Sequence, residues 1–260
     1  MDEYLRAILN KKTSNYNSIA VEKVKDFFYP AISDWARIWL NDYFVAGSVA
    51  KGVSIKGRSD FDFFVSVKCS CDDSLSDIYY SLFNRLTDYG REKGFTVRKQ
   101  NVSLGIKGLR YNGVPIDVDI VPAKQQNINS NYHSLYKSKQ NSWTQTNVKM
   151  HIDLVKNSGR REFIKLVKIW RECHHLEFPS INLELSVLDA LNRYPHDISL
   201  ESGLGVIMRY FSDSFIHLKQ VDPCNTNNIV SDDMTYNEKL LIKEKATQAI
   251  LANTWSDVIW

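Results

Sequence analysis

The decisive stretch of this chain is residues 45–64, which read VAGSVAKGVSIKGRSDFDFF. An apolar strand ends at Gly47, where the missing side chain lets the backbone approach a ligand closely. The chain then enters a predicted helix, and its free N–H groups and the Ser48 hydroxyl are suited to phosphate oxygens. The stretch therefore predicts one half of a triphosphate-binding site.

Two carboxylates close the same stretch. Asp60 and Asp62 lie at positions i and i+2 of a predicted strand, so both point to one side of a sheet while aromatic residues fill the other. On its own, such an Asp-x-Asp pair is most often a solvated strand face. When it stands 13 residues after the Gly47-Ser48 turn, it favours a site for a divalent metal.

Further carboxylates stand on residues 114–121, VPIDVDIV, which form a second predicted strand. Asp117 and Asp119 share one face of this strand, and the apolar residues share the other. Three carboxylates on neighbouring strands could hold two Mg²⁺ ions, one activating a hydroxyl and one holding a triphosphate. We therefore expect Asp60, Asp62 and a third aspartate to form a catalytic metal site.

The first half of the chain alternates helical and β patterns. It predicts helices at 18–39 and 74–93 and strands at 42–46, 61–67, 95–98, 102–111 and 114–121. Asn112-Gly113 predicts a hairpin turn between the last two strands, and Pro122 is expected to end the second of them. The polar segment 122–141 is expected to be an extended crossing segment.

From residue 146 onward the pattern is helical only. It predicts helices at 147–157, 161–174, 180–193, 200–219 and 236–253. We therefore expect an α+β chain with two domains, a mixed catalytic domain at 1–145 that includes the N-terminal helices and a helical domain at 146–260.

Composition limits the classes of protein further. The chain has 260 residues, 43% of them hydrophobic, with 11 Gly and 6 Pro, as expected for a folded globular protein. Its net charge of +3 does not favour binding of extended nucleic acid. With no apolar run long enough for a membrane span and no signal peptide, we expect a cytoplasmic location and no membrane partner.

At this point the sequence resembles the polymerase-β-type nucleotidyltransferases. The similarity rests on Gly47-Ser48, on Asp60-Phe61-Asp62 and on the run from Asp119 to Ala123, DIVPA. Within that superfamily it is closest to the branch of oligoadenylate synthetase, cyclic GMP-AMP synthase and the cGAS/DncV-like nucleotidyltransferases (CD-NTases). The segments 164–170, 178–185 and 222–228 resemble helical-domain motifs of this branch.

The resemblance implies roles for individual residues. Asp60, Asp62 and Asp119 would be the metal ligands and catalytic carboxylates, with Asp117 a neighbour of open role. It also implies a set of nucleotide-binding residues, namely Gly47, Ser48, Lys51, Lys168 and Ser180. For Lys51 a solvated loop position remains the alternative, and for Lys168 a solvated helix face.

Two positions depart from the family pattern. Val53 stands where the glycine loop usually continues with Thr, and Ile181 stands near the place of a base-stacking aromatic residue. Because an aliphatic side chain offers no π-stacking, the preference for a base is not carried over from the family.

The resemblance implies a nucleotidyltransferase with two Mg²⁺ ions, or Mn²⁺ in their place. Such an enzyme would join nucleoside triphosphates into a cyclic oligonucleotide, release pyrophosphate, and signal to a separate effector protein in anti-phage defence. Two alternatives stay open: a nucleotidyltransferase that extends RNA or tRNA 3′ ends, and a catalytically silent nucleotide-binding protein of toxin-antitoxin type. Against the first alternative, we expect no room for tRNA-binding tail domains in 260 residues. Against the second, all three carboxylates are present, whereas a catalytically silent relative is expected to have lost at least one.

Overall fold

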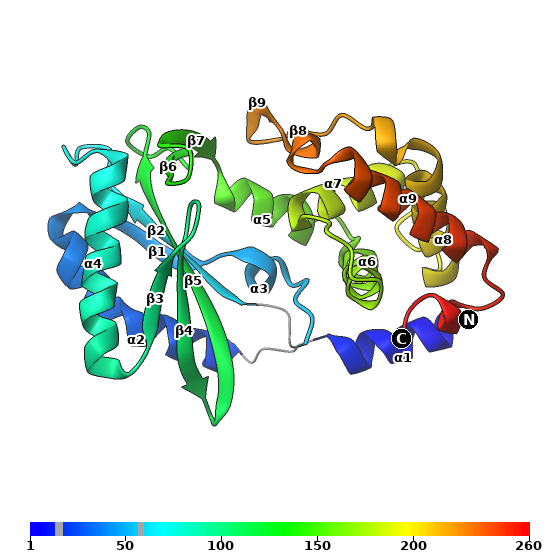
Figure 1. The fold of residues 1–260 in the computed structure, drawn as a ribbon, viewed down its shortest axis with the longest axis horizontal. Coiled ribbons are helices and arrows are strands. Elements are labelled where there is room, and N and C mark those ends of the chain that lie inside the picture. Colours follow the sequence, from blue (N-terminus) through cyan, green and yellow to red (C-terminus); the bar gives the residue numbers. More distant parts are fainter. Residues whose placement is uncertain (14–17, 57–59) are drawn as a thin grey trace. The chain divides into compact units, whose positions relative to one another are not determined.

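The computed structural model describes residues 1–13, 18–56 and 60–260, and Figure 1 shows its elements. Its contacts divide the chain into two compact units. One, the sheet unit, comprises residues 15–51 and 58–152. The other, the helical unit, comprises residues 1–14, 52–57 and 153–260.

The sheet unit contains a mixed sheet. Its elements are α2 (Ser18–Ala36), β1 (Leu40–Val45), α3 (Gly47–Lys51), β2 (Phe61–Val67), α4 (Leu75–Lys93), β3 (Thr96–Lys99), β4 (Leu104–Tyr111), β5 (Val114–Gln125), β6 (His133–Lys137) and β7 (Ser142–Thr146). The strand order is β1-β2-β5-β4-β3, with β6 on β5 and β7 on β6. β2 and β5 run parallel, and the other pairs are antiparallel. The predicted α+β class is thereby confirmed.

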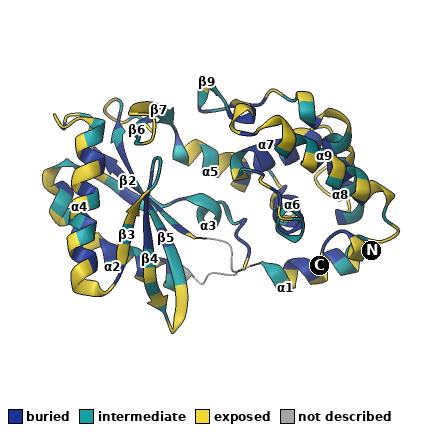
Figure 2. Ribbon diagram, viewed as in Figure 1, coloured by how far each residue is buried: buried dark blue, intermediate teal, exposed yellow. Residues whose placement is uncertain are grey.

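One face of this sheet is covered by α2 and α4. Phe61, Phe63 and Val65 alternate along β2 and are at most 2% exposed, packed with Phe28 of α2 and Leu82 of α4. Because side chains alternate across a strand, the intervening residues of β2 point to the opposite face. The packing that builds the core therefore also turns Asp62 away from it, and Figure 2 colours most of β2 as buried.

Strand β5 is longer than predicted, because Pro122 does not end it. The strand continues to Gln125, and Pro122 pairs with Val65 of β2. On the other edge of β5, the β4 register ends at Ile120 and the β6 register begins at Lys124. Pro122 lies in the gap between them, where no ladder hydrogen bond needs its missing N–H group.

The segment 122–141 was expected to be an extended crossing segment, but much of it is paired β-strand. Its second part forms β6, which pairs with β7 in the register Tyr136↔Trp143. Asn141 has a φ of 45° at the turn between these strands. Because Asn tolerates this left-handed conformation, the turn closes as a hairpin without a glycine.

The helical unit is built around one core. Its elements are α1 (Asp2–Lys12), α6 (Arg161–Cys173), α7 (Ser180–Ala190), α8 (Leu200–Ser214), β8 (Val221–Asp222), β9 (Asn225–Ile229) and α9 (Tyr236–Leu251), while α5 (Val148–Lys156) spans the boundary of the two ranges. Trp170 of α6 is fully buried beside Phe211 of α8, and their rings are stacked at 5.9 Å. The helices from α5 to α9 start where the sequence predicts them to within one residue.

Two expectations about this unit are corrected. Helix α1 was assigned to the catalytic domain, but Leu5, Ile8 and Leu9 are buried in the core of the helical unit. The region after residue 146 is also not purely helical, since β8 and β9 form a short hairpin in which Asp222 accepts a hydrogen bond from the Cys224 backbone N–H at 2.8 Å. In the parts of the chain that the structure describes, no helix is both long and apolar enough to cross a membrane.

Candidate active site

A row of residues crosses four strands at the place where the sequence predicts the metal site. Asp62 on β2 is the register partner of Asp119 on β5, Asp119 pairs with Gly105 on β4, and Gly105 pairs with Arg98 on β3. Residues paired across neighbouring strands point to the same face of a sheet, with strands about 4.8 Å apart. The fold therefore brings Asp62 and Asp119 side by side on the face away from α2 and α4.

Asp60 lies one residue before β2 and remains accessible to solvent. Partial loss of its hydration by neighbouring atoms nevertheless raises the pKa of Asp60. The charge of Asp117 raises this pKa further, while Lys107 and Arg98 lower it. For Asp119, burial raises the pKa first and the charge of Asp60 second. Asp60, Asp117 and Asp119 thus share one electrostatic environment, in which the negative charge of one carboxylate disfavours ionisation of the next.

This crowding of carboxylates fits a divalent cation. Mg²⁺ prefers oxygen ligands and is commonly bound by one or two carboxylates together with substrate phosphates. A bound cation would also remove the repulsion that raises the pKa of Asp60 and Asp119 in the free protein. The carboxylates of this site therefore fit the divalent cation that the sequence predicts.

Asp117 has a different surrounding from Asp119. Its carboxylate forms an ion pair with Lys107 of β4. This cation offsets the charge of Asp117, and Asp119 instead accepts a hydrogen bond from the neutral amide of Gln100 at 3.0 Å. The structure therefore gives the open position Asp117 a partner of its own, a contact that the sequence alone did not indicate.

Gly47 stands directly against Asp62. Its φ is 58°, and a Cβ atom at this position would lie 1.7 Å from Oδ2 of Asp62. Only a glycine can therefore occupy the turn while the carboxylate keeps its position. A backbone hydrogen bond from Ala46 N–H to the Asp62 carbonyl at 2.7 Å holds the two segments together.

Ser48 and Lys51 both lie in α3, which begins at Gly47. Both side chains are half-buried. Positions 57–59, between α3 and Asp60, lie outside the described residues. The turn, the short helix and β2 thus agree with the predicted order of elements, while the phosphate-binding role of Ser48 and Lys51 stays a prediction.

Lys168 has a setting that the sequence did not predict. It is only 3% exposed, and its Nζ forms an ion pair with Oε1 of Glu184 at 3.1 Å inside the helical unit. The alternative of a solvated helix face is therefore wrong, because Leu166 and Val167 around it belong to the core. Contact with a triphosphate stays a prediction, and it would have to share the ammonium with Glu184.

Ser180, the other predicted nucleotide-binding residue of the helical unit, is exposed at the start of α7. Its hydroxyl accepts a hydrogen bond from the Arg171 guanidinium at 3.3 Å, and the same nitrogen donates to the Phe178 carbonyl at 2.9 Å. Arg171 therefore links the end of α6 to the start of α7, and the nucleotide-binding role of Ser180 stays a prediction.

The buried ion pair leads to a first testable prediction. Lys168→Met should destabilise the protein by roughly 3–5 kcal/mol, because it removes the ammonium group that pairs with the buried Glu184 carboxylate. The double variant Lys168→Met/Glu184→Leu should recover much of this loss, since it removes both charges. Denaturant unfolding followed by circular dichroism measures both values. A single variant as stable as the wild type would contradict the buried pair.

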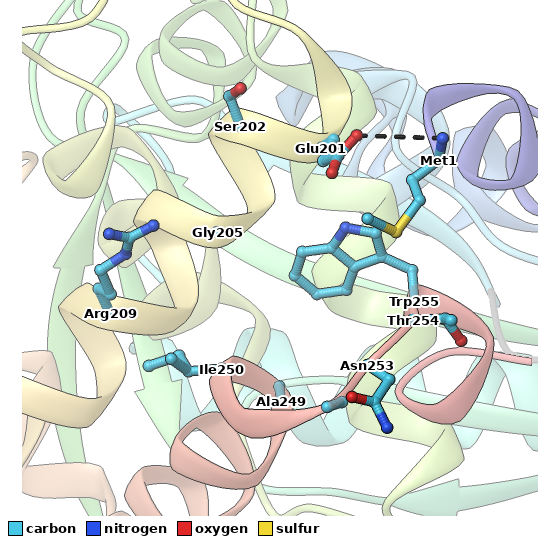
Figure 3. Close-up of a pocket in the computed structure, with 11 residues that line it drawn as sticks. Met1, Glu201, Ser202, Gly205, Arg209, Ala249, Ile250, Asn253, Thr254 and Trp255 are labelled. Atoms are coloured by element: carbon cyan, nitrogen blue, oxygen red, sulfur yellow. Dashed lines mark ion pairs between the residues drawn. The ribbon is translucent and has the colours of Figure 1, made fainter.

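The helical unit also contains a pocket of about 310 Å³, drawn in Figure 3. It is lined by Glu201 and Arg209 of α8 and by Trp255, and the α-amino group of Met1 lies 3.9 Å from Oε2 of Glu201. None of the predicted site residues lines it. The pocket is therefore separate from the predicted chemistry.

Comparisons with known proteins agree with this geometry. No protein-family model matches the chain. A cyclic AMP-AMP-AMP synthase of Escherichia coli strain MS 115-1 is 25% identical over 172 residues, 62% of this chain and 51% of that protein, so the match spans about half the length of this relative. The CBASS oligonucleotide cyclase CdnC of Escherichia coli strain KTE188 is 24% identical over 254 residues, 85% of this chain and 78% of that one.

Solved structures share the fold. The structure of Escherichia coli MS115-1 CdnC with ATP has a TM-score of 0.75 at 20% identity and covers 95% of this chain and 89% of its own. The Cid1 poly(U) polymerase, in an H336N mutant bound to MgATP, has a TM-score of 0.67 at 15% identity and covers 96% and 93%. The fold is therefore that of the polymerase-β-type nucleotidyltransferases.

The chain is thus similar to the oligonucleotide cyclase CdnC and to the cyclic AMP-AMP-AMP synthase. This similarity agrees with the CD-NTase family that the sequence motifs predict. The similarity to CdnC extends along most of the chain.

Proposed function

We propose that this protein is a metal-dependent nucleotidyltransferase that joins nucleoside triphosphates into a cyclic oligonucleotide second messenger. The observation that carries the proposal is the pairing of Asp62 with Asp119 across the parallel strands β2 and β5, with Asp60 in the same electrostatic environment. The similarity to an oligonucleotide cyclase along 85% of the chain supports the choice of product class.

The reaction that we propose forms one phosphodiester bond at a time. A ribose hydroxyl of one nucleotide attacks the α-phosphorus of another, the hydroxyl loses its proton, and pyrophosphate leaves. Mg²⁺, or Mn²⁺ in its place, supplies positive charge that activates the hydroxyl and stabilises the leaving pyrophosphate. We assign Asp60, Asp62 and Asp119 to holding this cation, since Asp62 and Asp119 lie side by side on one face of the sheet and the charge of Asp60 acts on Asp119.

The residues of α3 have a second role in this proposal. Ser48 would donate its hydroxyl to a phosphate oxygen, and Lys51 would supply charge near the same triphosphate. Support comes from their place in α3, which begins at Gly47, the residue that stands against Asp62. Lys168 and Ser180 remain candidate contacts of the nucleotide. The product would act on a separate effector protein in anti-phage defence. We propose no membrane partner for the synthase itself.

A second candidate function is extension of an RNA 3′ end, which the fold similarity to a poly(U) polymerase favours. An RNA-extending enzyme must hold a long polyanion, so its affinity for substrate falls steeply with salt. A messenger synthase needs only small nucleotides. The two functions therefore differ in their acceptor and in their response to ionic strength.

A direct assay distinguishes these functions and is our second prediction. The protein is incubated with four labelled nucleoside triphosphates and Mg²⁺, with and without a tRNA or oligo-A primer. We expect a short, phosphatase-resistant product whose mass fits a cyclic oligonucleotide. The amount of this product should be the same with and without primer. The Asp119→Asn variant is the matched control for background. Label found only in the primer, with no cyclic product of low mass, would favour the RNA-extending enzyme.

A further inference from the structure

A hydrogen-bonded residue that the sequence did not single out contacts Asp119. The side-chain amide of Gln100, just after β3, donates from Nε2 to Oδ1 of Asp119 at 3.0 Å. Asp119 is half-buried, and this bond lowers its pKa against the opposing effects of burial and Asp60. Gln100 therefore stabilises the charged form of a predicted metal ligand without adding a charge.

The orientation of this amide is determined by its neighbours. Ser103 donates its hydroxyl to Oε1 of Gln100 at 2.6 Å, and the Gln100 backbone N–H donates to the Ser103 carbonyl at 3.0 Å. Because the amide oxygen accepts from Ser103, its NH₂ group is directed toward Asp119. The rotamer of Asp119 thereby becomes linked to the β3–β4 turn.

The backbone of Gln100 is held from its other side. The Tyr79 hydroxyl donates to the Gln100 carbonyl at 2.6 Å, and the Ser138 hydroxyl donates to the same carbonyl at 2.7 Å. Tyr79 belongs to α4 and is only 1% exposed. The amide that contacts Asp119 is thus mounted on a well-anchored turn rather than on a free loop.

Gly105 provides the space in which this contact forms. It lies between Arg98 and Asp119 in the row across the sheet, and a Cβ atom there would lie 2.5 Å from Nε2 of Gln100 and 3.2 Å from Oδ1 of Asp119. Any larger residue would displace the Gln100 amide. The absence of a side chain at this register position therefore allows an amide from a neighbouring strand end to reach the carboxylate.

We propose that Gln100 is a positioning residue that fixes the rotamer of Asp119 for metal binding, with Gly105 keeping the space for it open. This inference rests on the proposed function of Asp119 as a metal ligand. Hydrogen-bonded partners of metal ligands contribute strongly to metal affinity, and their loss typically costs roughly 10- to 100-fold. Gln100 has the geometry of such a partner.

The test measures Mn²⁺ affinity of the full chain by electron paramagnetic resonance of free Mn²⁺, without turnover. Gln100→Leu should weaken Mn²⁺ binding by roughly tenfold or more, because it removes the donor to Asp119. Ser138→Ala is the matched control, since it removes a bond to the Gln100 backbone and leaves the amide in place. We expect this control to bind Mn²⁺ within about twofold of the wild type.

Gly105→Ala supplies an independent variant. The new methyl group meets the far end of a flexible side chain, so Gln100 can turn away and the sheet can keep its structure. We expect the same loss of Mn²⁺ affinity as in Gln100→Leu, and no further loss when the two are combined. Such non-additivity is the mark of two residues acting through one contact. Thermal unfolding of each variant establishes that the fold is retained.

The outcomes separate this inference from the function on which it rests. Wild-type protein that binds no Mn²⁺, or an Asp119→Asn variant that binds it normally, would overturn the proposed metal site itself. If the wild type binds Mn²⁺ and Asp119→Asn does not, but Gln100→Leu binds as the wild type does, only the positioning role is wrong. Additive losses in the double variant would also overturn it.

Discussion

Replacement of Asp62 or Asp119 by Asn is expected to lower the rate of pyrophosphate release by about 10³-fold or more. An amide keeps the shape of the side chain but loses the charge that holds a divalent cation. Charge stabilisation by a catalytic metal contributes several kcal/mol to lowering a barrier, and each ~1.4 kcal/mol changes the rate tenfold. Asp60→Asn should behave in the same way. The rate is measured with labelled triphosphates under saturating Mg²⁺.

The same variants should fold at least as stably as the wild type in metal-free buffer. The charge of Asp60 raises the pKa of Asp119, so the two carboxylates destabilise each other when both are ionised. Removing one charge relieves this repulsion, while added Mg²⁺ should raise the melting temperature of the wild type more than that of the variant. Loss of activity combined with loss of fold would leave the carboxylates as structural residues.

Asp117→Asn is the matched control for this prediction. Asp117 stands two residues before Asp119 on β5, on the same face, and is paired with Lys107. Because that ion pair already offsets its charge, the substitution should change the rate by less than about tenfold. A loss as severe as that of Asp119→Asn would mean that the third ligand is Asp117, two residues earlier on the same face of β5.

The strands that carry the site could be predicted from the sequence because their patterns are local. Phe61, Phe63 and Val65 alternate with Asp62, and this period of two predicts both the strand and the side on which the carboxylate lies. The pairing of β2 with β5 is different in kind. It joins residues more than fifty positions apart, so the strand pattern left open whether Asp117 or Asp119 is the third ligand, and only the family resemblance indicated Asp119.

The surroundings of the carboxylates could not be predicted for the same reason. Gln100 and Lys107 carry no motif, and their roles follow from register: Gly105 is opposite Asp119, so the end of β3 and the middle of β4 reach the carboxylates of β5. A helical pattern likewise gave a solvated helix face as the alternative for Lys168. The burial of Lys168 against Glu184 depends on the packing of α6 on α7, which a period of 3.6 residues does not encode.

Gly47→Ala is expected to lower activity by roughly 10²-fold or more, since displacement of a reacting group by about 1 Å has effects of this size. The new Cβ atom would lie 1.7 Å from Oδ2 and 2.4 Å from Cγ of Asp62, so the carboxylate must leave its position. The left-handed backbone adds roughly 1–2 kcal/mol of strain for any residue with a side chain. Steady-state rates and Mn²⁺ binding measure the first effect, and denaturant unfolding measures the second.

Gly94→Ala separates these two effects. Gly94 ends α4 with a φ of 80°, and a Cβ atom there would meet nothing within 4 Å. It therefore carries the same kind of backbone strain without touching a carboxylate, and we expect a comparable loss of stability with a rate within about threefold of the wild type. If Gly47→Ala reduces the rate no more than Gly94→Ala does, the turn at Gly47 serves the fold alone. A larger loss confined to Gly47→Ala would mean that the missing side chain at this turn holds Asp62 in its working position.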